Sequence, residues 1–223
     1  MKGHCRILKG ASGRIPLLGA KMDLISAKYN FTRPYRFELE GCEERELKPD
    51  INIFTDGSKS SRGTGSGIFS EELNLRQSIS LGHHPTVFQA ELIGLTLGTK
   101  AALDNNIYGK RIRFTTDSKA LLQALRGPKI NSALVLECHQ MLKRLAESNP
   151  VELVWVKGHT GNQGNEEADR LARKGSDRLF VGPELSLPLT SAALTSLIKK
   201  DTLRRHSLRW GADKDELQSE PLV

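Results

Sequence analysis

The hydrophobic pattern of the chain changes its period after residue 81. Between residues 51 and 81 apolar and polar positions alternate: in "INIFTD", Ile51, Ile53 and Thr55 face one way and their neighbours the other. The segments "RGTGSGIFS" and "LNLRQSISL" follow, separated by a turn at two glutamates. Alternation of this kind is typical of strands with one buried face. The pattern therefore predicts three short strands in an antiparallel meander.

A helical period begins after the turn-like sequence "GHHP". In residues 86–104 small and apolar residues recur at three- and four-residue intervals, and Glu91 falls on the same face, which we expect to be packed. A fourth strand, "RIRFTTDS", is predicted to end at Asp117. Two further helices (118–126 and 131–148), a fifth strand ("VELVWVKG") and a last helix ("NEEADRLARKG") follow.

The predicted order β-β-β-α-β-α-α-β-α indicates an α/β fold: a five-stranded mixed sheet flanked by helices. Asn165 is the expected N-cap of the last helix, and Gly175 is its expected end. Asp56 and Asp117 are both predicted to end strands, and functional sites gather at such ends in open α/β sheets.

The chain divides into three predicted regions. Residues 1–50 mix glycine, proline and charge and end in "EGCEERELKPD", which indicates an N-terminal extension or linker. Residues 51–180 carry the periodic pattern and form the predicted principal domain. In residues 181–223 the segment "LTSLIKKDTLRRHSLRW" predicts a basic amphipathic helix. An ordinary amphipathic surface helix would explain the same leucine spacing.

Charge favours a polyanionic partner without requiring one. The net charge is +7, and residues 51–180 hold 17 Lys and Arg against 13 Asp and Glu although they contain the candidate acids. A basic surface around an acidic spot suits nucleic acid held beside a cation-dependent centre. A mild positive charge also merely keeps many domains soluble, so charge alone leaves both interpretations open.

Cysteine use and hydropathy restrict the compartment. Cys5, Cys42 and Cys138 are odd in number and lie outside any Cys-x-x-Cys spacing, which favours reduced thiols and an intracellular location, nuclear or cytoplasmic. No stretch approaches eighteen uninterrupted apolar residues, so neither a membrane partner nor a membrane span is expected.

Taken one at a time, the candidate acids have ordinary explanations. An aspartate at a strand end is usually a turn residue, a glutamate on an inner helix face is often a paired ion, and Asp169 could simply favour a helix dipole. Together they form a pattern. "TDGS", "AE", "TDS" and "WVKGHTGNQGNEEADRLAR" resemble the motifs of the type I ribonuclease H family, in the family's order, over about residues 50–178. The resemblance implies a ribonuclease H-like fold.

The resemblance also implies a metal site. On matching positions, Asp56, Glu91, Asp117 and Asp169 would hold two Mg²⁺ ions, for which Mn²⁺ can substitute. Asp56 would bridge the ions, Asp169 would help hold the ion that generates hydroxide, and the other two carboxylates would hold the ion at the leaving oxygen. Four carboxylates this close repel one another unless divalent cations neutralise them, and carboxylate oxygens suit magnesium.

Further roles follow from the same resemblance. His159 would assist product release, although a loop histidine outside such a motif would usually have no such role. Gly57 and Ser58, with Ser118, would lie against the RNA strand and read its 2′-hydroxyls. Contacts of this kind carry no base information, so cleavage is expected to be largely independent of sequence. Trp155 is interpreted mainly as core packing.

The chain is most similar to the ribonuclease H domain that some retrotransposons lacking long terminal repeats carry after their reverse transcriptase. Only 42 residues separate Asp117 from His159, which leaves little room for the basic helix that other members use to grip the hybrid. A reverse transcriptase domain in the same polyprotein is therefore a possible partner, and binding by the isolated chain is expected to be weak.

The resemblance predicts an endonuclease that hydrolyses the RNA strand of RNA/DNA hybrids by a two-metal-ion mechanism. Two alternatives remain open on the sequence: a binding or scaffold module of the same fold without useful turnover, and a DNA nuclease or transposase of the same superfold. The presence of all four carboxylates and the histidine favours the nuclease over the scaffold. The motifs "TDGS" and "GNEEAD" favour ribonuclease H over the DNA enzymes.

Overall fold

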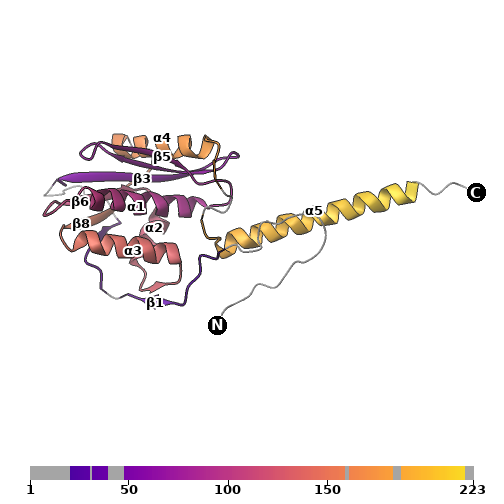
Figure 1. Ribbon diagram of the computed structural model, residues 1–223, viewed down its shortest axis with the longest axis horizontal. Coiled ribbons are helices and arrows are strands. Elements are labelled where there is room, and N and C mark those ends of the chain that lie inside the picture. Colours follow the sequence, from indigo (N-terminus) through magenta and orange to yellow (C-terminus); the bar gives the residue numbers. More distant parts are fainter. Residues whose placement is uncertain (1–20, 31, 40–47, 159–160, 183–186, 219–223) are drawn as a thin grey trace, which may run out of the picture.

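A six-stranded mixed sheet forms the centre of the protein (Figure 1). The computed structural model describes residues 21–30, 32–39, 48–158, 161–182 and 187–218, with side chains up to residue 207. The strands β3, β6, β8 and β2 run parallel to one another, and β4 and β5 continue the sheet antiparallel. In spatial order they are β2 (Arg36–Glu38), β8 (Val151–Trp155), β6 (Ile112–Thr116), β3 (Ile51–Lys59), β4 (Thr64–Ser70) and β5 (Leu75–Ser80).

Helices cover both faces of this sheet. Three of them, α1 (Val87–Asp104), α2 (Lys119–Arg126) and α3 (Ala133–Ala146), lie on one face, and α4 (Gln163–Asp177) lies on the other (Figure 1). A small second sheet pairs β1 (Lys28–Tyr29) with β7 (Lys129–Ile130). The predicted α/β arrangement of five strands and flanking helices is confirmed, and β2 adds a sixth strand that the sequence pattern does not predict.

The close packing of α4 on the sheet depends on small residues in β4. A Cβ atom added at Gly67 would lie 2.0 Å from the carbonyl oxygen of Ala168 and 2.5 Å from the backbone nitrogen of Ala172. No real side chain fits at such distances, so glycine is required where the helix crosses the strand. This contact fixes the height of α4 above the sheet and, with it, the position of Asp169.

Three local predictions are wrong. Asp56 does not end its strand, because β3 continues to Lys59 through pairing with β4. The N-cap of α4 is Asn162, whose side chain accepts a hydrogen bond from the backbone N–H of Asn165. Gly175 lies inside α4, which continues to Asp177.

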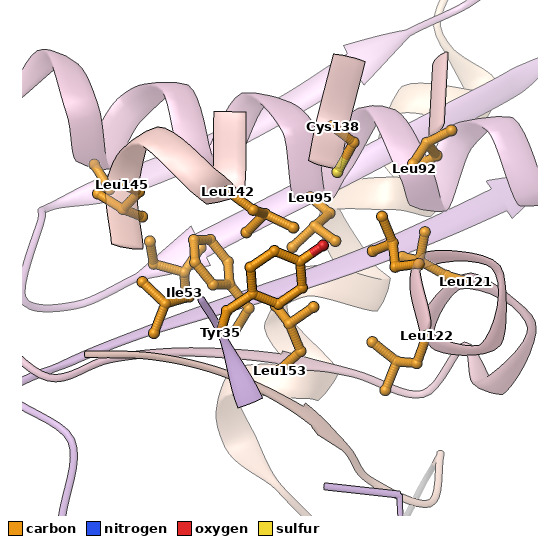
Figure 2. Packing of buried hydrophobic residues seen from close by; sticks show 14 of the residues in the cluster. Tyr35, Ile53, Leu92, Leu95, Leu121, Leu122, Cys138, Leu142, Leu145 and Leu153 are labelled. Atoms are coloured by element: carbon orange, nitrogen blue, oxygen red, sulfur yellow. The ribbon is translucent and has the colours of Figure 1, made fainter. Parts of the chain in front are cut away.

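Part of the N-terminal region belongs to the same core. Tyr35 is only 4% exposed, and Figure 2 shows its ring among leucines from the helices and from β8. The guanidinium of Arg33 donates to the carbonyl oxygens of Leu125 and Gly127, which ties this segment to the end of α2. The extension therefore packs against the predicted principal domain, whose boundary at residue 51 stays a prediction.

A long helix, α5 (Ser191–Gln218), projects from the body toward the C-terminus (Figure 1). Most of the described part of the tail is thus helical. Leu194 and Leu197 are half-buried, but Ile198 is 47% and Leu203 69% exposed, so the described apolar side chains do not form one buried stripe. Among the helices that the structure describes, none combines the length and apolar content needed for a bilayer span.

Candidate active site

The first two candidate carboxylates meet because of the sheet's register. β3 pairs with β6 only as far as Phe54 and Thr115, after which β3 continues alongside β4 alone. Asp56 lies just beyond this last pair, and Asp117 follows the end of β6. Parallel strands place the residues after their carboxyl ends at the same edge, so the two side chains are brought together.

The third carboxylate comes from α1. Glu91 lies in the helix at the point where it crosses Gly57, and a Cβ added at Gly57 would be 2.7 Å from the Glu91 backbone nitrogen. Glycine thus allows the helix to approach the strand closely enough to place Glu91 beside Asp56. The hydroxyl of Thr116 donates to Glu91 Oε2 over 3.5 Å. The predicted position of Glu91 on the packed face is confirmed.

These three side chains form a compact acidic cluster. Oxygen atoms of Asp56, Glu91 and Asp117 all lie within 4.8 Å of one another, and the first two residues are 6% and 5% exposed. Burial, and then the charge of Asp117, raise the pKa of Asp56 from 3.8 to about 7. Burial also raises the pKa of Glu91 well above its ordinary value, and the charges of both aspartates add to this effect. The cluster therefore favours either protons or a cation.

The fourth candidate, Asp169, lies beside this cluster on α4. Its charge and a side-chain hydrogen bond both contribute to the raised pKa of Asp56. Its Oδ1 also accepts a 2.9 Å charged hydrogen bond from Nε of Arg173, one turn further along the helix. The Asp169 carboxylate thus interacts both with the acidic cluster and with an exposed arginine.

The remaining predicted residues are placed as follows. Gly57 and Ser58 are half-buried in β3, and Ser118 caps α2 by accepting from the N–H of Leu121. His159 lies outside the described residues. The described part of its loop reaches the cluster, since a Cβ at Gly158 would be 2.7 Å from Asp117 Oδ2.

The sequence interpretation gave Trp155 too small a role. Its indole Nε1 donates to the carbonyl oxygen of Asp117 over 2.9 Å, and the ring is only half-buried. The ammonium group of Lys119 lies 3.9 Å from the centre of this ring, within cation–π distance. Trp155 therefore helps to fix the backbone at Asp117. The only signal of this role in the sequence is that a tryptophan lies at the end of a predicted strand. The structure then pairs that strand with β6.

The donor set of the cluster fits a hard divalent cation. All of its ligand atoms are carboxylate oxygens, which magnesium and manganese prefer, and no sulfur or imidazole ligand lies among the described members. The raised pKa values of the buried carboxylates provide a second reason: these groups ionise only at a cost in free energy, and a bound cation would remove their repulsion.

The mixed sheet, the helices on both faces and the buried carboxylates at the sheet edge define an α/β protein with a ribonuclease H-like fold and an acidic site suited to divalent metal. The family model described as RNase H matches residues 48–177. The chain belongs to the RNase H family, and it is a hydrolase of the ribonuclease H type.

Two ribonuclease H proteins of other organisms agree with this assignment. Ribonuclease H of Trichodesmium erythraeum is 30% identical over 158 residues, which cover 63% of this chain and 97% of that protein. Ribonuclease H of Rippkaea orientalis is 32% identical over 150 residues, which cover 57% and 86%. A solved structure of RNase H1 from Halobacterium salinarum aligns with a TM-score of 0.45 at 21% identity, covering 57% of this chain and 97% of that one.

Proposed function

We propose that this protein is an endonuclease that hydrolyses the RNA strand of RNA/DNA hybrids by a two-metal-ion mechanism, with little dependence on base sequence. The observation that carries the proposal is the convergence of Asp56, Glu91 and Asp117 within 4.8 Å at one edge of the sheet. Membership of the RNase H family implies the hybrid substrate and the endonucleolytic reaction.

The carboxylates are assigned to the metal site as a unit. Asp56 is proposed to contact both ions, Glu91 and Asp117 to hold the ion at the leaving oxygen, and Asp169 the other ion. Two ions held by these carboxylates would supply a hydroxide nucleophile at neutral pH and would stabilise both ends of a displacement at phosphorus. Mg²⁺ is the proposed ion, with Mn²⁺ as a substitute. His159 is proposed to assist product release.

Strand selection is assigned to the backbone beside Asp56. Helix α1 fills the space where a Gly57 side chain would lie, so the Gly57 backbone is the group proposed to face the ribose. The hydroxyl of Ser58 could donate a hydrogen bond to the ribose or accept one from it. Ser118 is proposed to contact the same strand, although its hydroxyl also caps α2. These contacts would read sugar and phosphate, which explains the expected indifference to base sequence.

A cleavage assay tests the proposal directly. A hybrid labelled separately on each strand is incubated with Mg²⁺, with Mn²⁺ and with a chelator, beside duplex DNA and a hybrid whose RNA strand lacks 2′-hydroxyls near one phosphate. We expect cutting of RNA only, at many positions, only with metal, and not at the modified phosphate. Equal cutting of duplex DNA would favour a DNA nuclease, and binding without turnover would favour a scaffold.

We further propose that the chain derives from a retrotransposon without long terminal repeats and works beside a reverse transcriptase domain in an intracellular compartment. One structural feature supports this origin. Between α2 and α3 the described chain contains only the two-residue strand β7, so no additional basic helix lies there. Residues 51–180 are proposed as the catalytic domain. Fusion to a reverse transcriptase domain should strengthen hybrid binding without changing which strand is cut.

A further inference from the structure

The base of α5 contacts the first turn of α1. Gln89, in the first turn of α1, donates from Nε2 to the carbonyl oxygen of Pro188 over 2.8 Å. Glu91 lies two residues further along the same helix, on the edge where Asp56 and Asp117 meet. The segment that leads into α5 is thus anchored within one helical turn of Glu91 along α1, on a different face of that helix.

The start of α5 is held firmly. Thr190 caps the helix by accepting from the backbone N–H of Ala193 over 3.1 Å. Leu189 is buried, and its backbone exchanges hydrogen bonds with Lys21 and Asp23 of the N-terminal segment. Leu194 and Leu197 are half-buried. The start of α5 is therefore tied to the body through Pro188 and Leu189.

Basic side chains gather where α5 leaves the body. Residues 191–207 carry four Lys and Arg and one Asp, and that acid, Asp201, pairs with Arg205 over 2.6 Å. Lys59, three residues after Asp56, donates from Nζ to the carbonyl oxygen of Pro85 over 2.7 Å. Partial burial lowers the pKa of Lys59, and the nearby charge of Lys200 lowers it further. Lys59 bonds to Pro85 and the base of α5 bonds to Gln89, so the two basic regions meet at the segment that leads into α1.

We propose that α5 is an arm that binds the phosphate backbone of the hybrid beside the acidic site, through Lys199, Lys200 and Arg204. The inference rests on the proposed function, because it takes the RNA/DNA hybrid as the ligand. It would give the chain a grip on substrate from its C-terminal helix, in place of a basic helix between α2 and α3. Lys59 continues the same positive surface onto the body.

The length and charge of α5 suit a nucleic-acid duplex as its ligand. The seventeen residues 191–207 span about 25 Å at 1.5 Å per residue, a length over which a nucleic-acid duplex carries about fifteen phosphate charges. A second copy of this chain would bring an equally basic helix, and like charges would oppose its docking. The exposed Ile198 and Leu203 are too few to form the continuous stripe that a coiled coil needs.

The test compares two variants with the same net charge. The arm variant is Lys199→Gln with Lys200→Gln, and the matched control is Lys100→Gln with Lys110→Gln, two exposed lysines at and beyond the other end of α1. Glutamine keeps helix propensity close to that of lysine. Binding of a labelled hybrid to each protein is measured by fluorescence anisotropy in a chelator at several salt concentrations, and cleavage kinetics are measured with Mg²⁺.

Loss of two phosphate contacts should reduce the slope of log affinity against log salt by about 1.8 in the arm variant and leave it unchanged in the control. Wild type should then lose about tenfold more affinity than the arm variant between about 50 and 200 mM salt. KM for the hybrid should rise at least tenfold with kcat unchanged.

Three other results are decisive. Equal slopes for the arm variant and the control, while wild type cleaves, would overturn the arm and leave the proposed function standing. A slope change without any cleavage by wild type would support the arm and refute the nuclease. If wild type and the control had the molecular mass of a dimer and the arm variant that of a monomer, the proposal would be overturned in favour of self-association through α5.

Discussion

Replacement of Asp56 by asparagine should stabilise the metal-free protein at alkaline pH while abolishing cleavage. The side chain is buried next to Asp117, and its pKa is raised from 3.8 to about 7. A carboxyl group whose pKa is higher in the folded state than in the unfolded state destabilises the fold once it must ionise. The penalty is absent below pH 3.8, grows between the two values, and is complete above pH 7.

The size of this penalty follows from the two pKa values. A rise from 3.8 to about 7 corresponds to about 4 kcal/mol of unfolding free energy at pH 8, and to less than about 1 kcal/mol at pH 4. Asparagine keeps an oxygen for the 2.8 Å hydrogen bond from the Gly57 N–H, but its amide must also be desolvated. We therefore expect a gain of about 2 to 4 kcal/mol at pH 8 and almost none at pH 4.

Urea unfolding in a chelator measures this gain directly, with the exposed Asp104→Asn variant as control. The control should stay within about 0.5 kcal/mol of wild type at both pH values. Added Mg²⁺ should then stabilise wild type but hardly affect the Asp56 variant, which narrows the difference between them. A variant that is less stable than wild type at pH 8, or one whose gain is equal at both pH values, would refute the electrostatic reasoning.

Three further predictions test other parts of the molecule. Gly57→Ala should destabilise the protein by about 1 to 3 kcal/mol and sharply reduce cleavage, because the added Cβ would lie 2.7 Å from the backbone nitrogen of Glu91. Thermal unfolding and cleavage assays test this, with Gly127→Ala as the control because the nearest atom to a Cβ there is 3.4 Å away. His159→Ala should slow turnover by about ten- to a hundredfold in single- and multiple-turnover assays, with unchanged Mg²⁺ affinity by calorimetry; loss of metal binding would make it a ligand instead. Burial and the charges of two basic side chains lower the pKa of His139, so wild type should lose stability relative to His139→Gln as pH falls below about 6.5. Parallel profiles of unfolding free energy against pH for the two proteins would contradict this.

The sequence predicted the central strands and the acids because those features depend on local pattern. Ile51, Ile53 and Thr55 are all buried, as their alternation indicates. The three clustered carboxylates were found through their motifs, but no local pattern shows that β3 stops pairing with β6 at Phe54, and this register brings them together. Asp169 also forms an ion pair with Arg173. This pair depends on a side-chain rotamer, which the sequence does not reveal.

The missed features depend on tertiary contacts. β2 has only three residues, too few for a visible alternation, and it is a strand only because β8 offers an edge to pair with. Asn162 and Asn165 are equally good helix caps in isolation. The structure selects Asn162 because Gly164 and Asn165 are buried in the first turn, where Gly164 packs on the ring of Phe54. Likewise, the hydrogen bond from Trp155 to the Asp117 carbonyl requires the β6–β8 register.

The pairing of β2 with β8 has a practical consequence for where the polypeptide can be cut. A shorter chain begun at residue 48, where the family match starts, would lack Arg36–Glu38 and Tyr35. The N–H and C=O groups of β8 on that side would be left without strand partners, and a cavity would open among the core leucines. An unpaired edge beside exposed apolar surface invites intermolecular strand pairing. Aggregation of such a truncated protein would reflect the lost edge strand and would say nothing about its catalytic competence.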